Sequence, residues 1–262
     1  MTIVFDIETG PLPDDVLAER FTFDESKIPG FALLSQEFDP ATVKTGNLKD
    51  ETKIKEKIEK AREDFHLKKR TAEIALEEGR ADAWNAFVDK AALSPLTGQV
   101  LAVGVWNSTA EKGNEFLISC IQEGFGERDL IEGTLGLLES AVLSGQRIIG
   151  HNILAFDLPF LLRRGLFYGI ASPVSLMNQL DAYRPQYVID TIRYWQFNNR
   201  SEQAVSLDKL AQFFGTTRKN GSGALFYKKF FGSEAERTES IEYLYNDIVM
   251  TVEIAGKLGV IR

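Results

Sequence analysis

Apolar and polar positions along the chain first define a short strand that ends in two acids. The sequence begins MTIVFDIETG, in which Ile3, Val4 and Phe5 are typical of a buried strand. Side chains alternate across a strand, so Asp6 and Glu8 lie on the same face. Two like charges on one face cost free energy unless a cation lies between them, and Mg²⁺ prefers carboxylate oxygen. The pair is therefore either a solvated strand end or half of a metal site, and partners further along the chain decide between these readings.

The same patterning predicts a mixed α/β core after about residue 95. Short apolar runs predict strands at residues 99–106, 115–120, 147–150 and 187–191. Apolar positions at helical spacing predict helices at residues 127–145, 156–166, 206–215 and about 236–257. Antiparallel strands followed by alternating helices and strands favour a mixed sheet covered by helices.

A long polar stretch, at about residues 11–94, separates the first strand from this core. Apolar residues recur at helical spacing within residues 50–92, and Gly79 lies between two such stripes, which predicts a charged helical hairpin. The mixture of positive and negative charge favours a solvated helix pair over a dedicated binding arm. We therefore expect one domain over residues 1–262, in which residues 11–94 are an insertion.

Composition narrows the class of protein. The net charge of −8 disfavours a protein that binds nucleic acid over a broad basic surface. It does not disfavour a nuclease, because the acids of a metal site add negative charge. Cys120 is the single cysteine, so an intrachain disulfide is excluded and a reducing compartment, the cytoplasm, is expected. The presence of only two histidines disfavours a zinc site of the His/Cys type. No apolar run approaches the roughly 20 residues of a membrane span, and no cleaved leader is expected.

Two further acids, Asp157 and Asp247, are candidates to complete a metal site. Asp157 follows a predicted strand and a short loop, and alone it is explained as the N-cap of the next helix. Tyr243 and Asp247 are four residues apart on the last predicted helix, so they share neighbouring faces. Alone, Asp247 is explained as a surface acid and Tyr243 as a partly buried aromatic residue.

Together these stretches resemble the DEDD superfamily of 3′–5′ exonucleases in its tyrosine form. The matching residues are Asp6 and Glu8 in FDIET, Asn152, Phe156 and Asp157 in HNILAFD, and Tyr243 and Asp247 in the spacing Tyr-x-x-x-Asp. Glu242 stands where the histidine form of the third motif has its histidine. LTGQVLAVGV, VIDTIRYW and LDKLAQFFG make the chain most similar to the proofreading exonuclease domain of family B DNA polymerases, in particular its stand-alone bacterial and phage members.

This resemblance implies a fold, a cofactor and a mechanism. The implied fold is ribonuclease H-like, with a five-stranded mixed sheet flanked by helices and a large helical insertion after strand one. The implied cofactors are two divalent metal ions, Mg²⁺ or Mn²⁺, that clamp the attacking and leaving oxygens of a phosphodiester. By resemblance, Asp6 bridges both ions, while Glu8 and Asp247 hold the ion that activates water. Asp157 serves the other ion, and Tyr243 orients the attacking water.

Substrate contacts are predicted from the same motifs and from local basic residues. The predicted contacts are Thr9, Asn152, Phe156, Arg218 and Lys219, and further basic pairs occur at residues 163–164 and 228–229. Phe156 either stacks on a terminal base or is a core residue. Residues 215–223 either wrap a phosphate through backbone N–H groups or form a flexible connector. Asp190 is expected to order the end of its strand rather than bind metal, and His151 to adjoin the site without a catalytic role.

The sequence thus predicts a metal-dependent 3′–5′ exonuclease that releases nucleoside 5′-monophosphates. The expected partner is the 3′ end of single-stranded DNA, a choice that rests on the resemblance to the polymerase branch, and no membrane partner is expected. One alternative is the same chemistry on RNA, because nothing in the motifs reads the 2′-hydroxyl. The alternative of another class is a non-catalytic nucleic-acid-binding module, which would have no need to keep four acids and the tyrosine.

Overall fold

The computed structural model describes residues 1–109, 113–181, 185–197, 199 and 201–261. Contacts divide the chain into two compact units: a core unit, Met1–Asp14 with Lys90–Arg262, and an arm unit, Asp15–Asp89. Every residue proposed above for metal or substrate binding belongs to the core unit. No helix among the described residues is long and apolar enough to cross a membrane.

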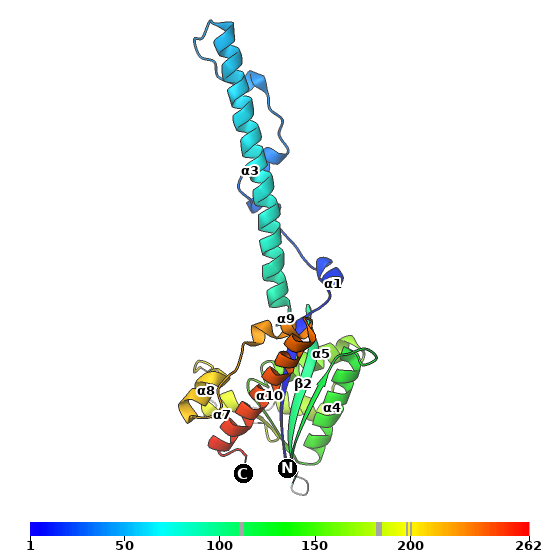
Figure 1. The fold of residues 1–262 in the computed structure, drawn as a ribbon. Coiled ribbons are helices and arrows are strands. Elements are labelled where there is room, and N and C mark those ends of the chain that lie inside the picture. Colours follow the sequence, from blue (N-terminus) through cyan, green and yellow to red (C-terminus); the bar gives the residue numbers. More distant parts are fainter. Residues whose placement is uncertain (110–112, 182–184, 198, 200, 262) are drawn as a thin grey trace. The chain divides into compact units, whose positions relative to one another are not determined.

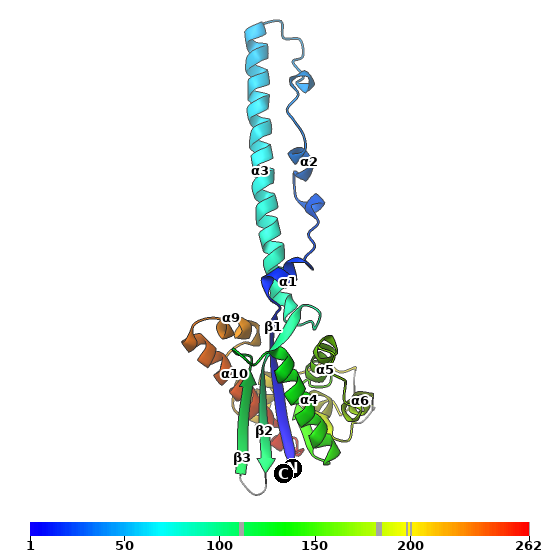
Figure 2. The same ribbon diagram turned by 90° about the vertical axis from the view of Figure 1, so that its right-hand side faces the viewer.

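The core unit is built on a five-stranded mixed sheet whose order is β3-β2-β1-β4-β5. Its strands are β1 (Thr2–Pro11), β2 (Gly98–Thr109), β3 (Gly113–Cys120), β4 (Arg147–Gly150) and β5 (Val188–Asp190). β1, β2 and β3 pair antiparallel (Figure 2). β4 is parallel to both β1 and β5. This sheet, flanked by helices, confirms the expected α/β fold class and is consistent with a ribonuclease H-like architecture.

Helices cover both faces of this sheet. The core helices are α4 (Glu127–Leu143), α5 (Asp157–Phe167), α6 (Val174–Asp181), α7 (Thr191–Trp195), α8 (Leu207–Phe214), α9 (Phe226–Phe230) and α10 (Glu234–Lys257), with a 3₁₀ turn at Gly223–Leu225. The β1 side chains Ile3, Phe5 and Ile7 pack against α4 and α5, whereas Val4 packs against α9 and α10. The sequence pattern predicts α4, α5, α8 and α10 but not α6, α7 or α9. With five residues each, α7 and α9 are too short to establish a period.

Gly104 on β2 explains how α10 comes close to the centre of the sheet. It lies opposite Asp6 in the pairing of β1 with β2. A Cβ at this position would lie 3.1 Å from side-chain atoms of Leu244 and Ile248 on α10. Because glycine has no side chain, α10 packs directly over β2 at the residue that is paired with Asp6 of β1.

The arm unit corrects one prediction. Between β1 and β2 the chain forms α1 (Asp14–Ala18), a 3₁₀ turn at Glu25–Lys27, α2 (Phe31–Leu34), a 3₁₀ turn at Pro40–Thr42 and α3 (Glu51–Ala91). The predicted helical hairpin at about residues 50–92 is wrong, because α3 is one uninterrupted helix of 41 residues (Figure 1). Glycine inside a helix costs only about 1 kcal/mol, so Gly79 does not end it.

The segment that precedes α3 packs along that helix and accounts for Gly79. A Cβ at Gly79 would lie 2.6 Å from Cδ1 of Ile28, so the glycine makes room for the returning chain. Phe21 packs on the rings of Trp84 and Phe87, with centroid distances of 5.2 and 5.5 Å. The apolar stripes of α3 therefore face this segment rather than each other.

A buried ion pair corrects the reading of residues 163–164 as a basic pair. Arg164 is 1% exposed, and its Nη2 lies 2.6 Å from Oε2 of Glu127. The same carboxylate accepts hydrogen bonds from the backbone N–H of Val100 and the hydroxyl of Tyr168. Arg164 thus joins α5 to α4 and β2, and only Arg163 is exposed.

Candidate metal centre

Three elements of the core unit bring the predicted acids together. Asp6 and Glu8 are half-buried on the face of β1 that α10 covers, as their shared strand face predicts. One ligand oxygen from each of Asp6, Glu8 and Asp247 lies within 4.8 Å of the others. Asp247 is only 5% exposed, so it is not the surface acid that its helix position alone would explain.

Asp157 reaches the same place from the other side of the sheet. It is the first residue of α5, and the N-cap position is Phe156, so the N-cap reading of Asp157 is wrong. Its Oδ1 instead accepts a hydrogen bond of 3.2 Å from the backbone N–H of Ile7, which lies between Asp6 and Glu8 on β1. Asp157 is 3% exposed and is thereby fixed beside the first acid pair.

The electrostatics of the four acids indicate a site for cations. Burial raises the pKa of all four, to about 7 for Asp157 and well above the ordinary value for Asp6 and Glu8. The negative charge of neighbouring acids raises the pKa of Asp6 and Glu8 further. Oδ1 of Asp247 is buried and has no hydrogen-bond partner among the described residues. Clustered carboxylate oxygens with an unpaired lone-pair donor fit Mg²⁺ or Mn²⁺, which are hard cations.

Tyr243 and Tyr245, two residues apart on α10, have different surroundings. Tyr243 is 7% exposed, one turn before Asp247, and packs against Phe226. Burial raises the pKa of Tyr243 above its ordinary value, so its hydroxyl keeps its proton at neutral pH and can donate a hydrogen bond. Tyr245 is 44% exposed and its ring lies 4.8 Å from that of Phe116 on β3.

The four acids and Tyr243 line a cleft of about 500 Å³ in the core unit. Of the predicted site residues, the cleft contains Asp6, Glu8, Asn152, Phe156, Asp157, Lys219, Tyr243 and Asp247. Thr9 and Arg218 are not among its lining residues. The hydroxyl of Thr9 donates to the carbonyl oxygen of Ala92 at 2.7 Å, and Arg218 binds both carboxylate oxygens of Asp208 at 2.8 and 2.9 Å.

One amide and one aromatic side chain of the second motif line the cleft. Asn152 is exposed and has a left-handed backbone (φ 65°), a conformation that asparagine tolerates better than most residues. Phe156 is half-buried, packs on Phe160 at the edge of the apolar core and also lines the cleft, and its stacking on a terminal base stays a prediction.

The cleft also contains residues that the motifs do not predict. Residues 204–207, which connect α7 to α8, form one wall. His151 lines the cleft, and burial lowers its pKa to about 4, so its ring is neutral at physiological pH. The apolar and small residues of this wall carry no chemical signature, and only the fold brings them to the site.

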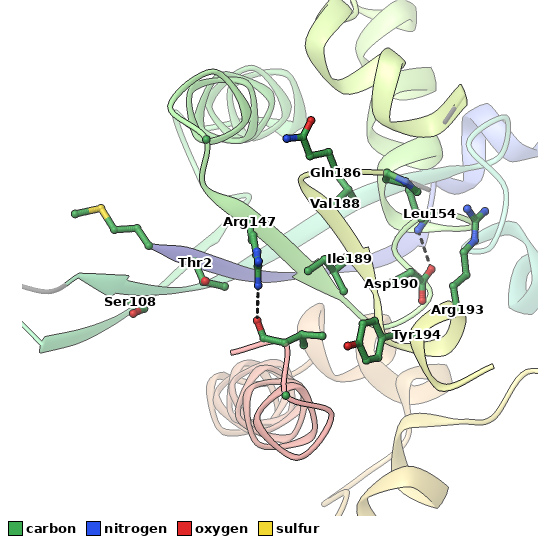
Figure 3. Close-up of a pocket in the computed structure, with 15 residues that line it drawn as sticks. Thr2, Ser108, Arg147, Leu154, Gln186, Val188, Ile189, Asp190, Arg193 and Tyr194 are labelled. Carbon is green, nitrogen blue, oxygen red and sulfur yellow. Dashed lines mark hydrogen bonds between the residues drawn. The ribbon is translucent and has the colours of Figure 1, made fainter. Parts of the chain in front are cut away.

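A larger cavity, of about 770 Å³, lies elsewhere in the core unit, beside the first residues of β1 and β4 (Figure 3). Thr2, Arg147 and Arg193 are among its lining residues, and Arg147 donates to the carbonyl of Val260 at 3.3 Å. Asp190 also lines it, but this carboxylate accepts backbone N–H groups of residues 152, 154 and 192, which confirms that it orders the strand end. None of the four clustered acids is among its lining residues, so the smaller cleft is the candidate site.

Comparison with known proteins gives a limited result. No family model and no curated protein matches the chain. Among solved structures, it is similar to the family B DNA polymerase of the hyperthermophilic archaeon Pyrobaculum calidifontis, with a TM-score of 0.47 and 21% sequence identity. The similarity covers 63% of this chain and 22% of the polymerase chain. We therefore draw the function from the site residues.

Proposed function

We propose that this protein is a metal-dependent 3′–5′ exonuclease acting on single-stranded DNA ends. One observation carries the proposal: four acids from β1, α5 and α10 converge with Tyr243 in a single cleft. Their order and spacing are those of the three motifs noted above. A non-catalytic binding module would have no use for a buried carboxylate oxygen without a partner, because such an atom costs stability.

The residues of the cleft have distinct roles in the proposed reaction. Asp6, Glu8, Asp157 and Asp247 would hold two divalent ions, which would supply an activated water and neutralise charge on the scissile phosphate. Asp6 would serve both ions, because it interacts with Asp157 of α5 and clusters with Asp247 of α10. Tyr243, kept protonated by burial, donates its hydroxyl toward the attacking water and orients it.

The substrate enters the cleft by its 3′ end. Phe156 offers an aromatic face on which a terminal base stacks, a contact that contributes roughly 1–3 kcal/mol in other proteins. Asn152 presents an amide to the sugar or phosphate. His151, neutral and hydrogen-bonded at 2.8 Å between its Nδ1 and the Thr191 hydroxyl, shapes the wall and does not act as the general base.

A matched degradation assay tests the proposal. Purified protein is incubated with 5′-labelled single-stranded DNA or RNA of one sequence, in Mg²⁺, in Mn²⁺ or in chelator. We expect a ladder of DNA products shortened from the 3′ end, with metal only. Asp247→Asn and Asp6→Asn abolish it, whereas Glu132→Gln on the exposed side of α4 leaves it intact.

Three results of this assay bear on the proposal in different ways. Degradation in chelator, or near wild-type rates from a folded Asp247→Asn variant, contradicts the four-acid mechanism. Faster shortening of RNA than of DNA keeps the mechanism and reassigns the substrate. Binding of the labelled strands without any shortening indicates the binding module instead.

A further inference from the structure

The cavity beside the first residues of β1 and β4 differs in charge from the acidic cleft. Its charged side chains are those of Arg147, Arg193 and Asp190, and its other described lining residues have none. The carboxylate of Asp190 already accepts three backbone N–H groups. The cleft, in contrast, contains four carboxylates and one ammonium group. In a chain of net charge −8, this cavity is therefore a place where positive side chains outnumber acids.

The two arginines of the cavity have donors to offer. Among the described residues, neither forms an ion pair with an acid. Nη1 of Arg193 is buried and has no hydrogen-bond partner in the described part of the chain. Arg147 is exposed, and its hydrogen bond goes to the carbonyl of Val260 rather than to a carboxylate. A buried guanidinium N–H without an acceptor costs stability, so the cavity favours a ligand that supplies one.

An exposed aromatic ring lies in the same cavity. Tyr194 of α7 is 45% exposed and belongs to the lining. In the view of Figure 3 its ring lies between Arg147 and Arg193. The remaining polar side chains of the lining are uncharged, namely Thr2, Ser108 and Gln186. The volume of about 770 Å³ is within the range of roughly 300–1,000 Å³ that small-molecule sites occupy.

These groups together select a class of ligand. Guanidinium groups bind phosphate through paired, charge-assisted hydrogen bonds. An exposed tyrosine ring offers a face on which a nucleobase stacks. Hydroxyl and amide groups form hydrogen bonds with a sugar or with the edge of a base. A ligand that carries both a phosphate and a flat ring uses all of them, whereas a bare anion leaves the tyrosine without a role.

We propose that this cavity is a nucleotide-binding site, in which Arg193 binds the phosphate, Tyr194 stacks on the base and Arg147 is a second donor. None of the four clustered acids lines the cavity, so the inference goes beyond the proposed function and does not depend on it. Its shared chemistry, a phosphate beside a base, has two sources. One is a free nucleoside monophosphate, and the other is one unit of a bound strand.

Calorimetric titration of the whole protein in chelator tests this assignment. The probes are deoxyadenosine 5′-monophosphate, deoxyadenosine and inorganic phosphate. We expect the monophosphate to bind at least about tenfold tighter than either of the others, because it alone offers both groups. Metal is left out because the bare acids of the cleft then repel phosphate. A protein that cleaves no DNA can still pass this titration, so failure of the proposed function and failure of this site are distinguishable.

Three variants assign the contacts. Arg193→Met should weaken the binding of the monophosphate and of inorganic phosphate by about tenfold or more, because both lose a charge-assisted hydrogen bond. Tyr194→Ala should weaken the monophosphate by about tenfold and leave inorganic phosphate unchanged, because only the base stacks. Arg147→Met should also weaken the monophosphate. Since Arg147 is exposed, this variant carries the test if circular dichroism shows that Arg193→Met does not fold.

The matched control is Arg163→Met, which removes an exposed arginine of α5 that does not line the cavity. It should leave every titration unchanged and so excludes a general effect of net charge. A short oligodeoxynucleotide in the same buffer identifies the source: tighter binding than that of the monophosphate assigns the site to a strand, and weaker binding assigns it to the free nucleotide. Absence of monophosphate binding at millimolar concentration overturns the proposal. Equal binding of the monophosphate and inorganic phosphate does so too, as does wild-type affinity in folded Arg147→Met and Tyr194→Ala.

Discussion

Neutralising Asp157 should stabilise the protein when metal is absent and only above a defined pH. Burial raises the pKa of Asp157 from its ordinary 3.8 to about 7, although the Ile7 N–H stabilises the ionised form. A rise of that size corresponds to about 4 kcal/mol, because each pKa unit is worth about 1.4 kcal/mol. Asp157→Asn has nearly the same shape, keeps an oxygen to accept the Ile7 hydrogen bond, and never ionises. The variant should therefore gain up to about 4 kcal/mol above pH 7.

The sign of the pH dependence follows from proton binding. Between pH 3.8 and about 7 the folded wild type holds a proton on Asp157 that the unfolded chain releases, so wild-type stability falls as pH rises through this window. Near pH 4 the folded carboxyl is protonated and the unfolded one is still about half protonated, so wild type and Asp157→Asn should differ little. Urea unfolding followed by circular dichroism in chelator, at several pH values, measures the difference.

A metal titration and a surface acid complete this experiment. Saturating Mg²⁺ or Mn²⁺ should stabilise the wild type, by about 2.7 kcal/mol at one hundred times the dissociation constant, and should stabilise the variant less. Asp208→Asn is the control in which the effect on stability has the opposite sign. Arg218 lowers the pKa of Asp208 to about 2, so the stabilisation that the ionised Asp208 contributes is lost only in acid. If Asp157→Asn changes stability equally at pH 4 and above pH 7, or if metal stabilises it as strongly as the wild type, the assignment of Asp157 to the centre is wrong.

Three further substitutions test other parts of the molecule. Tyr243→Phe should slow single-turnover cleavage by roughly ten- to a thousandfold and leave strand binding in Ca²⁺ unchanged, whereas Tyr245→Phe should be silent; the reverse order would contradict the assignment on α10. Arg164→Met should cost about 3–5 kcal/mol in urea unfolding, because it leaves Glu127 buried without its partner, while exposed Arg163→Met should cost almost nothing. Replacement of Asp15–Asp89 by a short Gly/Ser linker should leave the core unit folded and able to shorten very short strands. The cost of loop closure depends weakly on length, and none of the three clusters of buried apolar residues contains a residue of the arm. Loss of cooperative unfolding would refute this prediction.

The parts of the fold that the sequence predicts are those with strong periodicity. β1 and α10 carry unambiguous patterns, and their alternation and helical spacing place Asp6, Glu8, Tyr243 and Asp247 on faces that do meet in the structure. The error in the arm has a physical cause. Local sequence records that Gly79 is a poor helix former, but not that Ile28, fifty-one residues earlier, occupies the space where its side chain would be. Tertiary packing therefore decides whether a glycine ends a helix or receives a neighbour.

Some of the predicted substrate contacts line the cleft and others do not, for a related reason. Arg218 and Lys219 are equivalent as a sequence pattern, but successive side chains of a loop point to different sides. Arg218 therefore binds Asp208 on α8, whereas Lys219 binds Asp247 on α10. Thr9 follows Glu8 directly, yet a register shift between these residues turns its hydroxyl to the carbonyl of Ala92. Motif spacing therefore identifies the acids, whose shared negative charge a bound cation would offset. Which of the two basic residues reaches the acids depends on the long-range partners of the loop, and here Glu253 and Asp208 hold the backbone so that Lys219 enters the cleft.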